Sequence, residues 1–182
     1  KVTYEMAWAL KDAGKDAESN AAFARLATSY PKSSLANESL FRVAEYHYDA
    51  GRYADASKSY GDVLERAGQG ELGEKALHKL GWCFFKLNDF EKAAQTFAAQ
   101  AQKFPTGQLA PDAQFLAGEC YFQREQWKEA SGVYAKVIAV KSPNYHAMAL
   151  YRSGQCAANQ EQWAESATFH KQVLDQFADF AQ

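Results

Sequence analysis

The chain has 182 residues, of which 47% are hydrophobic, 14% aromatic and 23% charged, with only 4 prolines and 11 glycines. This composition is typical of an ordered globular protein and excludes a disordered or collagen-like chain. The formal net charge of -2 and the pI near 6.1 argue against the strongly basic surface that nucleic-acid binding usually requires. No apolar run approaches the roughly 20 residues of a membrane-spanning helix, so we expect no direct membrane insertion of this segment.

A short motif recurs along the whole chain. After a weaker first copy, GKDAES at 14–19, it reads GRYADAS at 51–57, NDFEKAA at 88–94, EQWKEAS at 125–131 and EQWAESA at 161–167. Successive copies begin 37, 37, 37 and 36 residues apart. A period of this size is typical of repeat proteins in which each unit is one supersecondary element.

Two small residues, twelve positions apart, mark each repeat within apolar residues at helical spacing. Glycine inside a helix costs about 1 kcal/mol relative to alanine, so close contact between two helices is the best explanation for it. Each repeat is therefore predicted to be two antiparallel helices that touch at small residues. The first small residues are Ala7, Ala44, Gly81, Gly118 and Gly154, and the second are Ser19, Ala56, Ala93, Ala130 and Ser166.

A large ring follows the second small residue by four positions, and we expect it to fill the space between successive helix pairs. These residues are Phe23, Tyr60, Phe97, Tyr134 and, in the last repeat, His170.

The expected helix pairs occupy residues 1–34, 35–71, 72–108, 109–144 and 145–182 in chain order. Prolines in SYPKSS (29–34), KFPTGQ (103–108) and VKSPNY (140–145) end second helices, because proline and the residue before it leave helical geometry. The glycines of GQGELG (68–73) are expected to form the remaining turn. A single helix pair cannot bury its own apolar face, so the prediction is one all-α solenoid domain over residues 1–182.

This spacing resembles the tetratricopeptide repeat, most completely in Gly81, Phe84, Ala93, Phe97 and Pro105. The resemblance covers the whole chain in five copies and implies a right-handed superhelical solenoid of about ten helices. The period is longer than the family's usual 34 or so residues, and the tryptophan usual in the first helix is absent. Its place is taken by Leu40, Leu77, Gln114 and Leu150.

The repeat length and the Tyr-Pro or Phe-Pro endings resemble the repeats of bacterial envelope proteins, such as the Tol-Pal coordinator and the β-barrel assembly lipoprotein. This narrower likeness favours a periplasmic location, with the cytoplasm as the alternative. The sequence has no initiating methionine at Lys1 and no signal peptide, so we expect it to be a segment of a longer protein.

Three cysteines, Cys83, Cys120 and Cys156, hold one position in successive repeats, 37 and 36 residues apart. Stacked helices lie roughly 8–10 Å apart, whereas a disulfide tolerates a Cα separation of at most about 7 Å. We therefore expect three half-buried thiols that act as small hydrophobic side chains, and a reactive thiol is the less favoured alternative.

No set of residues in the sequence predicts catalysis. The four histidines fall in several registers without an HExxH motif, and neither a GxSxG, a GxGxxG nor a phosphate-binding loop is present. Acidic pairs such as Asp89 with Glu91 lie on turns, where no pocket would shift a pKa. The prediction is a protein that is not an enzyme and has no cofactor and no metal site.

In tetratricopeptide repeats the first helices line a concave groove, and the resemblance implies which positions face it. They lie six and three residues before the first small residue, and one and four residues after it. Transferred to this sequence, the candidate partner-binding residues are Tyr4, Trp8, Phe41, Glu45, Tyr48, His78, Trp82, Phe85, Phe115, Glu119, Phe122 and Tyr151. The family's clamp for a C-terminal carboxylate is not expected, because glutamate or tryptophan stands where that clamp has asparagine.

So many rings on a face that would otherwise be wet favour binding of a protein or peptide with large apolar anchors. Glu45 and Glu119 add an acidic bias that would favour basic residues in the partner. The alternative for each ring is that it braces a neighbouring helix. The chain would then be a structural spacer, or an assembly module that packs against other domains of its own chain.

Overall fold

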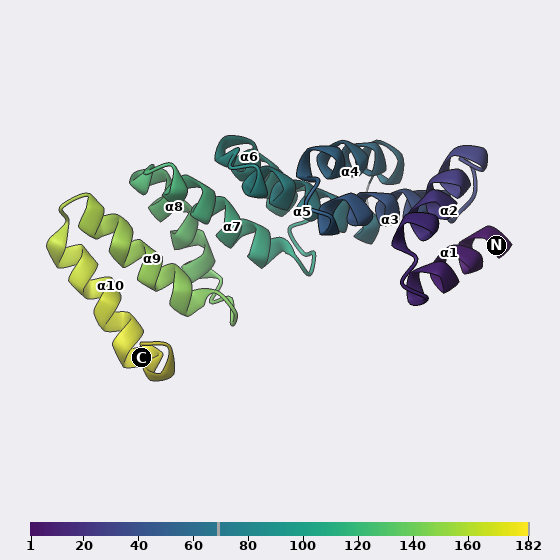
Figure 1. Ribbon diagram of the computed structural model, residues 1–182. Coiled ribbons are helices and arrows are strands. Elements are labelled where there is room, and N and C mark those ends of the chain that lie inside the picture. The colour runs from purple at the N-terminus through teal and green to yellow at the C-terminus, as the bar shows by residue number, and fades with distance from the viewer. Residues whose placement is uncertain (69, 182) are drawn as a thin grey trace. The chain divides into compact units, whose positions relative to one another are not determined.

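A computed structural model describes residues 1–68 and 70–181, and these residues form helices and no strands (Figure 1). The chain divides into two compact units, residues 1–88 and residues 89–182.

The first unit contains five helices that pack in chain order. They are α1 (Val2–Asp12), α2 (Asp16–Ser29), α3 (Ala36–Asp49), α4 (Tyr53–Ala67) and α5 (Glu71–Lys86). Each helix packs against the next, and α3 also contacts α5. This is the arrangement expected when successive helix pairs cover one another's apolar faces.

The second unit continues the pattern with α6 (Phe90–Lys103), α7 (Ala110–Gln123), α8 (Trp127–Ala139), α9 (His146–Asn159) and α10 (Trp163–Gln176). Neighbouring helices again pack pairwise. A short helix, α11 (Ala178–Ala181), follows and packs on α10. The predicted all-α fold is confirmed, and α11 is an addition that the repeat pattern did not predict.

The turn between the two helices of a repeat has a residue in left-handed backbone conformation at the same position each time. Its φ angle lies between 58° and 72° at Gly14, Gly51, Asn88, Glu125 and Glu161. The next backbone N–H closes the end of the first helix by donating to the carbonyl five residues back, as from Lys15 to Leu10 at 2.9 Å. Glycine adopts this φ without steric cost, whereas the two glutamates carry local backbone strain.

The predicted contact between small residues is confirmed in the first unit. The Ser19 hydroxyl on α2 donates a hydrogen bond of 2.8 Å to the Ala7 carbonyl on α1. Ala44 and Ala56 are fully buried in one core cluster with Tyr60. The small side chains therefore let α1 approach α2, and α3 approach α4, closely.

In the second unit the glycines of the first helices face rings. A Cβ atom added to Gly118 would lie 2.5 Å from Tyr134 Cε1, and one added to Gly154 would lie 2.7 Å from His170 Cε1. The ring four positions after the second small residue thus packs inside its own helix pair. The glycine makes room for the ring, and Tyr134 also lies in one core cluster with Ala149 and Cys156 of the next repeat, in line with the expectation that such a ring fills the space between successive pairs.

One predicted turn is shorter than expected. Helix α5 begins at Glu71, so Gly73 lies in its first turn, and Gln69 lies outside the described residues. Glu71 and Glu74 favour this early start because acidic side chains stabilise the N-terminal turn of a helix. Among the described residues, no helix combines the length and the apolar character needed to cross a membrane.

Candidate functional site

We call the surface formed by the predicted groove positions of α1, α3 and α5, and separately of α7 and α9, the first-helix face. Three of its twelve candidate residues are buried: Phe41, His78 and Phe115 are 5%, 8% and 8% exposed. Phe41 packs edge-on against Tyr60, with ring centroids 5.4 Å apart. These three side chains therefore belong to the core, in agreement with the bracing alternative for them.

Phe115 shows how such a ring holds two repeats together. It stacks on Tyr145 with centroids 5.0 Å apart and lies 5.7 Å from Tyr134. The Tyr145 hydroxyl in turn donates to Asp112 Oδ1 at 2.6 Å. This cluster joins α7 to the start of the following repeat and leaves Phe115 little surface for a partner.

The rings of α1 are half-buried. Tyr4 and Trp8 each lie 5.7 Å from Phe23 on α2, in edge-to-face geometry. The Arg42 guanidinium on α3 lies over the Trp8 ring, 4.9 Å from its centroid. Both rings are thus fixed by the helix behind them and keep part of their surface accessible.

A cation from the following repeat lies over a ring of the first-helix face at three junctions. The pairs are Arg42 over Trp8 at 4.9 Å, Lys79 over Tyr48 at 4.8 Å and Arg152 over Phe122 at 4.6 Å. Each cation stands two residues before the first small residue of its repeat. Such contacts contribute about 0.5–2 kcal/mol each. The sequence reasoning missed these residues, although the basic side chains at one register position were the signal for them.

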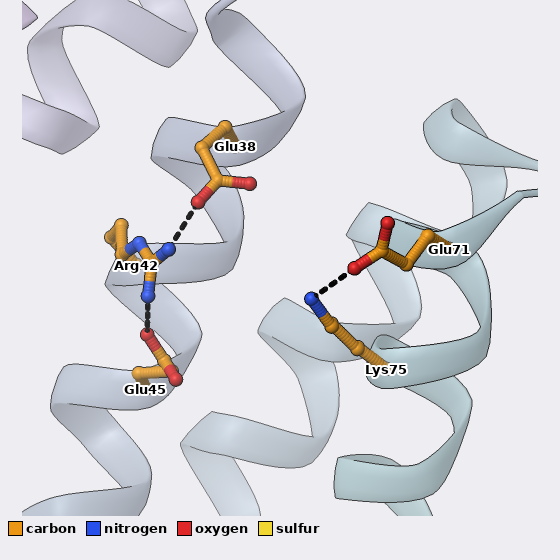
Figure 2. A network of polar contacts seen from close by, with 5 residues as sticks. All are labelled: Glu38, Arg42, Glu45, Glu71 and Lys75. Carbon is orange, nitrogen blue, oxygen red and sulfur yellow. Dashed lines mark hydrogen bonds and ion pairs between the residues drawn. The ribbon is translucent and has the colours of Figure 1, made fainter. Parts of the chain in front are cut away.

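The two glutamates of the candidate set are neutralised. Arg42 donates to Glu45 at 2.6 Å and also to Glu38, as Figure 2 shows beside the separate Lys75–Glu71 pair. Burial acts to lower the pKa of Arg42, but Glu45 and Glu38 outweigh it, so the pKa is raised and the charge persists.

Glu119 has a different set of partners in the second unit. It accepts two hydrogen bonds of 2.8 Å from Arg152 and one of 2.5 Å from the Tyr134 hydroxyl. Burial, with Glu119 adding to it, raises the pKa of Tyr134. Because Glu45 and Glu119 are both paired with arginine, the acidic bias expected from the sequence does not hold for these two residues.

The remaining candidates keep accessible surface. Trp82 and Phe85 form an edge-to-face pair with centroids 5.4 Å apart, and the Trp82 indole N–H donates to His78 Nε2 at 3.1 Å. Tyr151 is 37% exposed, and its hydroxyl accepts a 3.0 Å hydrogen bond from Gln155. The accessible part of the first-helix face consists of Tyr4, Trp8, Tyr48, Trp82, Phe85, Phe122 and Tyr151.

The cysteines are structural, as expected. Cys83, Cys120 and Cys156 are free, and they are fully buried where the sequence predicted half-buried side chains. Burial raises their pKa values to about 12, 12 and 11, so the thiols stay protonated and unreactive at neutral pH. Over residues 1–68 and 70–181, no group of three or more His, Cys, Asp or Glu side chains is arranged to hold a metal ion.

Comparisons with protein-family models match most of the chain to one family. Two family models, both described as tetratricopeptide repeat, match it: one covers residues 43–108 and 78–146, and the other covers residues 2–33. No curated protein matches the chain.

Several solved structures share the fold at low identity. The MamA protein is 17% identical, with a TM-score of 0.76 over 96% of this chain and 89% of that one. YrrB, a TPR protein with an unusual peptide-binding site, is 19% identical, with a TM-score of 0.71 over 97% and 86%. A tetratricopeptide repeat protein from Parabacteroides merdae is 15% identical, with a TM-score of 0.77 over 98% and 68%.

Proposed function

Since the chain belongs to the tetratricopeptide repeat family, whose members are generally protein-interaction scaffolds, we propose that its first-helix face binds an extended or helical segment of another protein. The ligand is a protein or peptide with large apolar anchors. The chain acts without a cofactor and carries out no catalysis of its own. The finer resemblance in repeat length and in the Tyr-Pro and Phe-Pro endings favours a bacterial envelope setting.

The observation that carries this proposal is the state of the accessible rings. Trp8, Tyr48 and Phe122 are held by cations from the next repeat yet are only half-buried. A ring that only braces the fold stabilises it most when the ring is buried, as Phe41 and Phe115 are. Rings that are fixed but accessible lose little conformational entropy on binding, which is why aromatic residues dominate binding hot spots.

YrrB supports the proposal as a protein of the same fold with a peptide-binding site. The competing proposal is the spacer or self-assembly module. The neutralisation of Glu45 and Glu119 and the burial of His78 favour bracing at those positions. The two proposals therefore differ over the accessible rings and agree over the buried ones.

The test is a peptide selection followed by calorimetry. A random peptide library is displayed on phage and selected against the purified chain, and the recovered peptides are titrated into it. Truncating an aromatic hot-spot residue in an interface costs about 2 kcal/mol or more, and the losses of neighbouring residues do not simply add. Trp82→Ala with Phe85→Ala should therefore weaken binding by about 100-fold or more.

Two control variants keep the result specific. Trp163→Ala removes the indole of a tryptophan that is 67% exposed on α10, outside the first-helix face, and Lys128→Ala removes an exposed charge on α8. Both should bind the selected peptides like the wild type. If the Trp82 and Phe85 variant loses stability but keeps its affinity, the accessible rings brace the fold and the spacer proposal stands.

A further inference from the structure

The second unit contains a groove of about 580 Å³ between α6, α7 and α8. This volume is within the range of about 300–1,000 Å³ that is typical of binding pockets in proteins. Ala110 and Ala117 of α7 are buried at its floor, and its walls include Ala101 on α6 and Val133 and Val140 on α8. Most of the lining residues are alanine, valine or proline, so the groove is mainly apolar.

The groove is separate from the first-helix face. Ala117 lines the groove, whereas Glu119 and Phe122 of the same helix belong to the first-helix face. At 3.6 residues per turn, Ala117 lies roughly 140–160° around the axis of α7 from these two residues. A segment bound in the groove therefore leaves the first-helix face of this unit free.

Small side chains at two repeat positions leave the groove open. Ala101 stands eight residues after the second small residue of its repeat, where the second repeat has Leu64. Ala117 directly precedes the first small residue of its repeat, where the third repeat has Leu80. In the first unit, Leu64 and Leu80 both pack against one core cluster. The groove is therefore the space that two leucine-sized side chains fill at the preceding junction.

Val140 extends the apolar surface to the rim of the groove. It follows the last residue of α8 and is 65% exposed. The other four repeats have polar residues at this position: Ser29, Arg66, Lys103 and Gln176. An apolar surface that continues from a groove to its exposed rim is typical of an interaction site.

The charge of the lining favours an anionic group. Lys136 is the one charged side chain among the described residues that line the groove, and it is exposed. Gln102 and Gln114 are the other polar residues of the lining. Asp112, in the first turn of α7, accepts the hydrogen bond of the Tyr145 hydroxyl instead. One positive charge without a negative one is complementary to a carboxylate in the occupant.

We propose that this groove binds a segment of a second protein that carries two leucine-sized side chains and an acidic residue. The two apolar side chains lie against Ala101 and Ala117, and the carboxylate accepts a hydrogen bond from the Lys136 ammonium group. The inference does not depend on the proposed function, because the groove and the first-helix face are separate surfaces. The chain then holds two partners at once.

The test uses a minimal probe, acetyl-Leu-Glu-Leu-amide, which has two leucines, one side-chain carboxylate and no terminal charge. It is titrated into the isotopically labelled chain and followed by NMR. We expect saturable shifts of the methyl signals of Ala101, Val133 and Val140. Acetyl-Leu-Gln-Leu-amide should bind roughly two- to fivefold more weakly, because exposed ion pairs contribute little, and acetyl-Leu-Lys-Leu-amide more weakly still. Equal affinity of the three probes, or no saturable shift at these methyl groups, would overturn the proposal.

Filling the groove is the sharpest test of its assignment. Ala101→Leu places in α6 the side chain that Leu64 provides in the second repeat, and it should abolish the shifts at Val133 and Val140. Ala99→Leu is the matched control, because Ala99 is exposed on the same helix and is absent from the lining. If the Ala101 variant unfolds at the same temperature as the wild type and still binds the probe, the assignment is wrong.

The charge is tested separately. Lys136→Gln should make the glutamate and glutamine probes bind equally, whereas Lys128→Gln, which changes another exposed lysine of α8, should keep the difference between them. A difference that persists in the Lys136 variant would contradict the role of this ammonium group.

Two further measurements identify the surface and the occupant. The Trp82 and Phe85 variant should bind the probe like the wild type, and loss of binding there would place the probe on the first-helix face and overturn the groove assignment. The chain alone should sediment as a monomer. Concentration-dependent association that Ala101→Leu abolishes would mean that a second copy fills the groove, which would also overturn the proposal.

Discussion

Gly118→Ala tests how tightly helices α7 and α8 of the second unit pack against each other. The added Cβ would lie 2.5 Å from Tyr134 Cε1 and 2.9 Å from Cδ1, about 1 Å closer than carbon atoms in normal contact. Tyr134 cannot move aside easily, because it is fully buried, packs on Phe115 and donates its hydroxyl to Glu119. The ring must shift as a unit or the helices must separate.

The expected loss of stability follows from three contributions. Overpacking costs about 1–3 kcal/mol, and weakening the hydrogen bond to a charged acceptor costs up to about 1.5–3 kcal/mol. The better helix propensity of alanine offsets about 1 kcal/mol of this. We therefore expect Gly118→Ala to lower the free energy of unfolding by about 1.5–5 kcal/mol.

The assay is urea unfolding followed by far-UV circular dichroism, with Gly132→Ala as the matched control. A Cβ on Gly132, in the adjacent helix α8, would meet no atom within 4 Å. That variant should therefore gain up to about 1 kcal/mol from helix propensity. If both variants unfold at the same urea concentration, the close packing of Tyr134 on Gly118 is wrong.

Three further outcomes are expected. Tyr60→Phe should raise the free energy of unfolding by about 1 kcal/mol, because the buried Tyr60 hydroxyl has no hydrogen-bond partner. Tyr134→Phe should lower it by about 1.5–3 kcal/mol, because it removes the hydrogen bond to Glu119. Urea unfolding of both variants checks this contrast. Glu125→Gly should raise the free energy of unfolding by about 0.5–1 kcal/mol, because glycine adopts the φ of 58° at this position without strain. A lower melting temperature of the variant would show that Glu125 is not strained. Burial raises the pKa of Cys120 to about 12, above the ordinary thiol value of about 8.5. The folded state therefore holds this proton more tightly, and stability should fall as pH rises from about 8.5 towards 12. Cys120→Ala should make that fall shallower in a pH series of unfolding curves.

The helices and their contacts could be predicted because they depend on short-range patterns that recur. Apolar spacing of 3.6 residues places each helix, and the small residues twelve apart identify the closest approach, as the Ser19 to Ala7 hydrogen bond shows. The repeat also held a signal for the strained turns. Gly14, Gly51 and Asn88 share one register, so the glutamates at 125 and 161 had to adopt the same left-handed φ.

The candidate site was only partly predictable, because exposure depends on what the next repeat supplies. Position within the repeat assigns Phe41 and Tyr48 to the same surface, yet Phe41 is buried and Tyr48 is half-buried under Lys79. Likewise, the sequence does not reveal that Arg42 bonds both Glu38 and Glu45 of its own helix. Such choices between competing partners are set by three-dimensional distances that a single repeat motif does not contain.

Repeats two and four place the same residue types in the same register and connect them differently. In the fourth repeat, Glu119 joins the Tyr134 hydroxyl to Arg152 of the following repeat. In the second, Glu45 bonds Arg42 of its own helix, and the Tyr60 hydroxyl stays unsatisfied.

The residue at the position of Arg152 in the repeat after the second is Lys79, which lies over the Tyr48 ring. A lysine has no planar fork with which to hold a carboxylate through two parallel hydrogen bonds. The fourth repeat also has Leu116 where the second has Arg42. The connection between two neighbouring repeats therefore depends on the side chain at this one register position in the earlier and in the later repeat. Mutation can adjust each junction, and with it the exposure of one ring, without altering the small residues that hold the helices of a pair together.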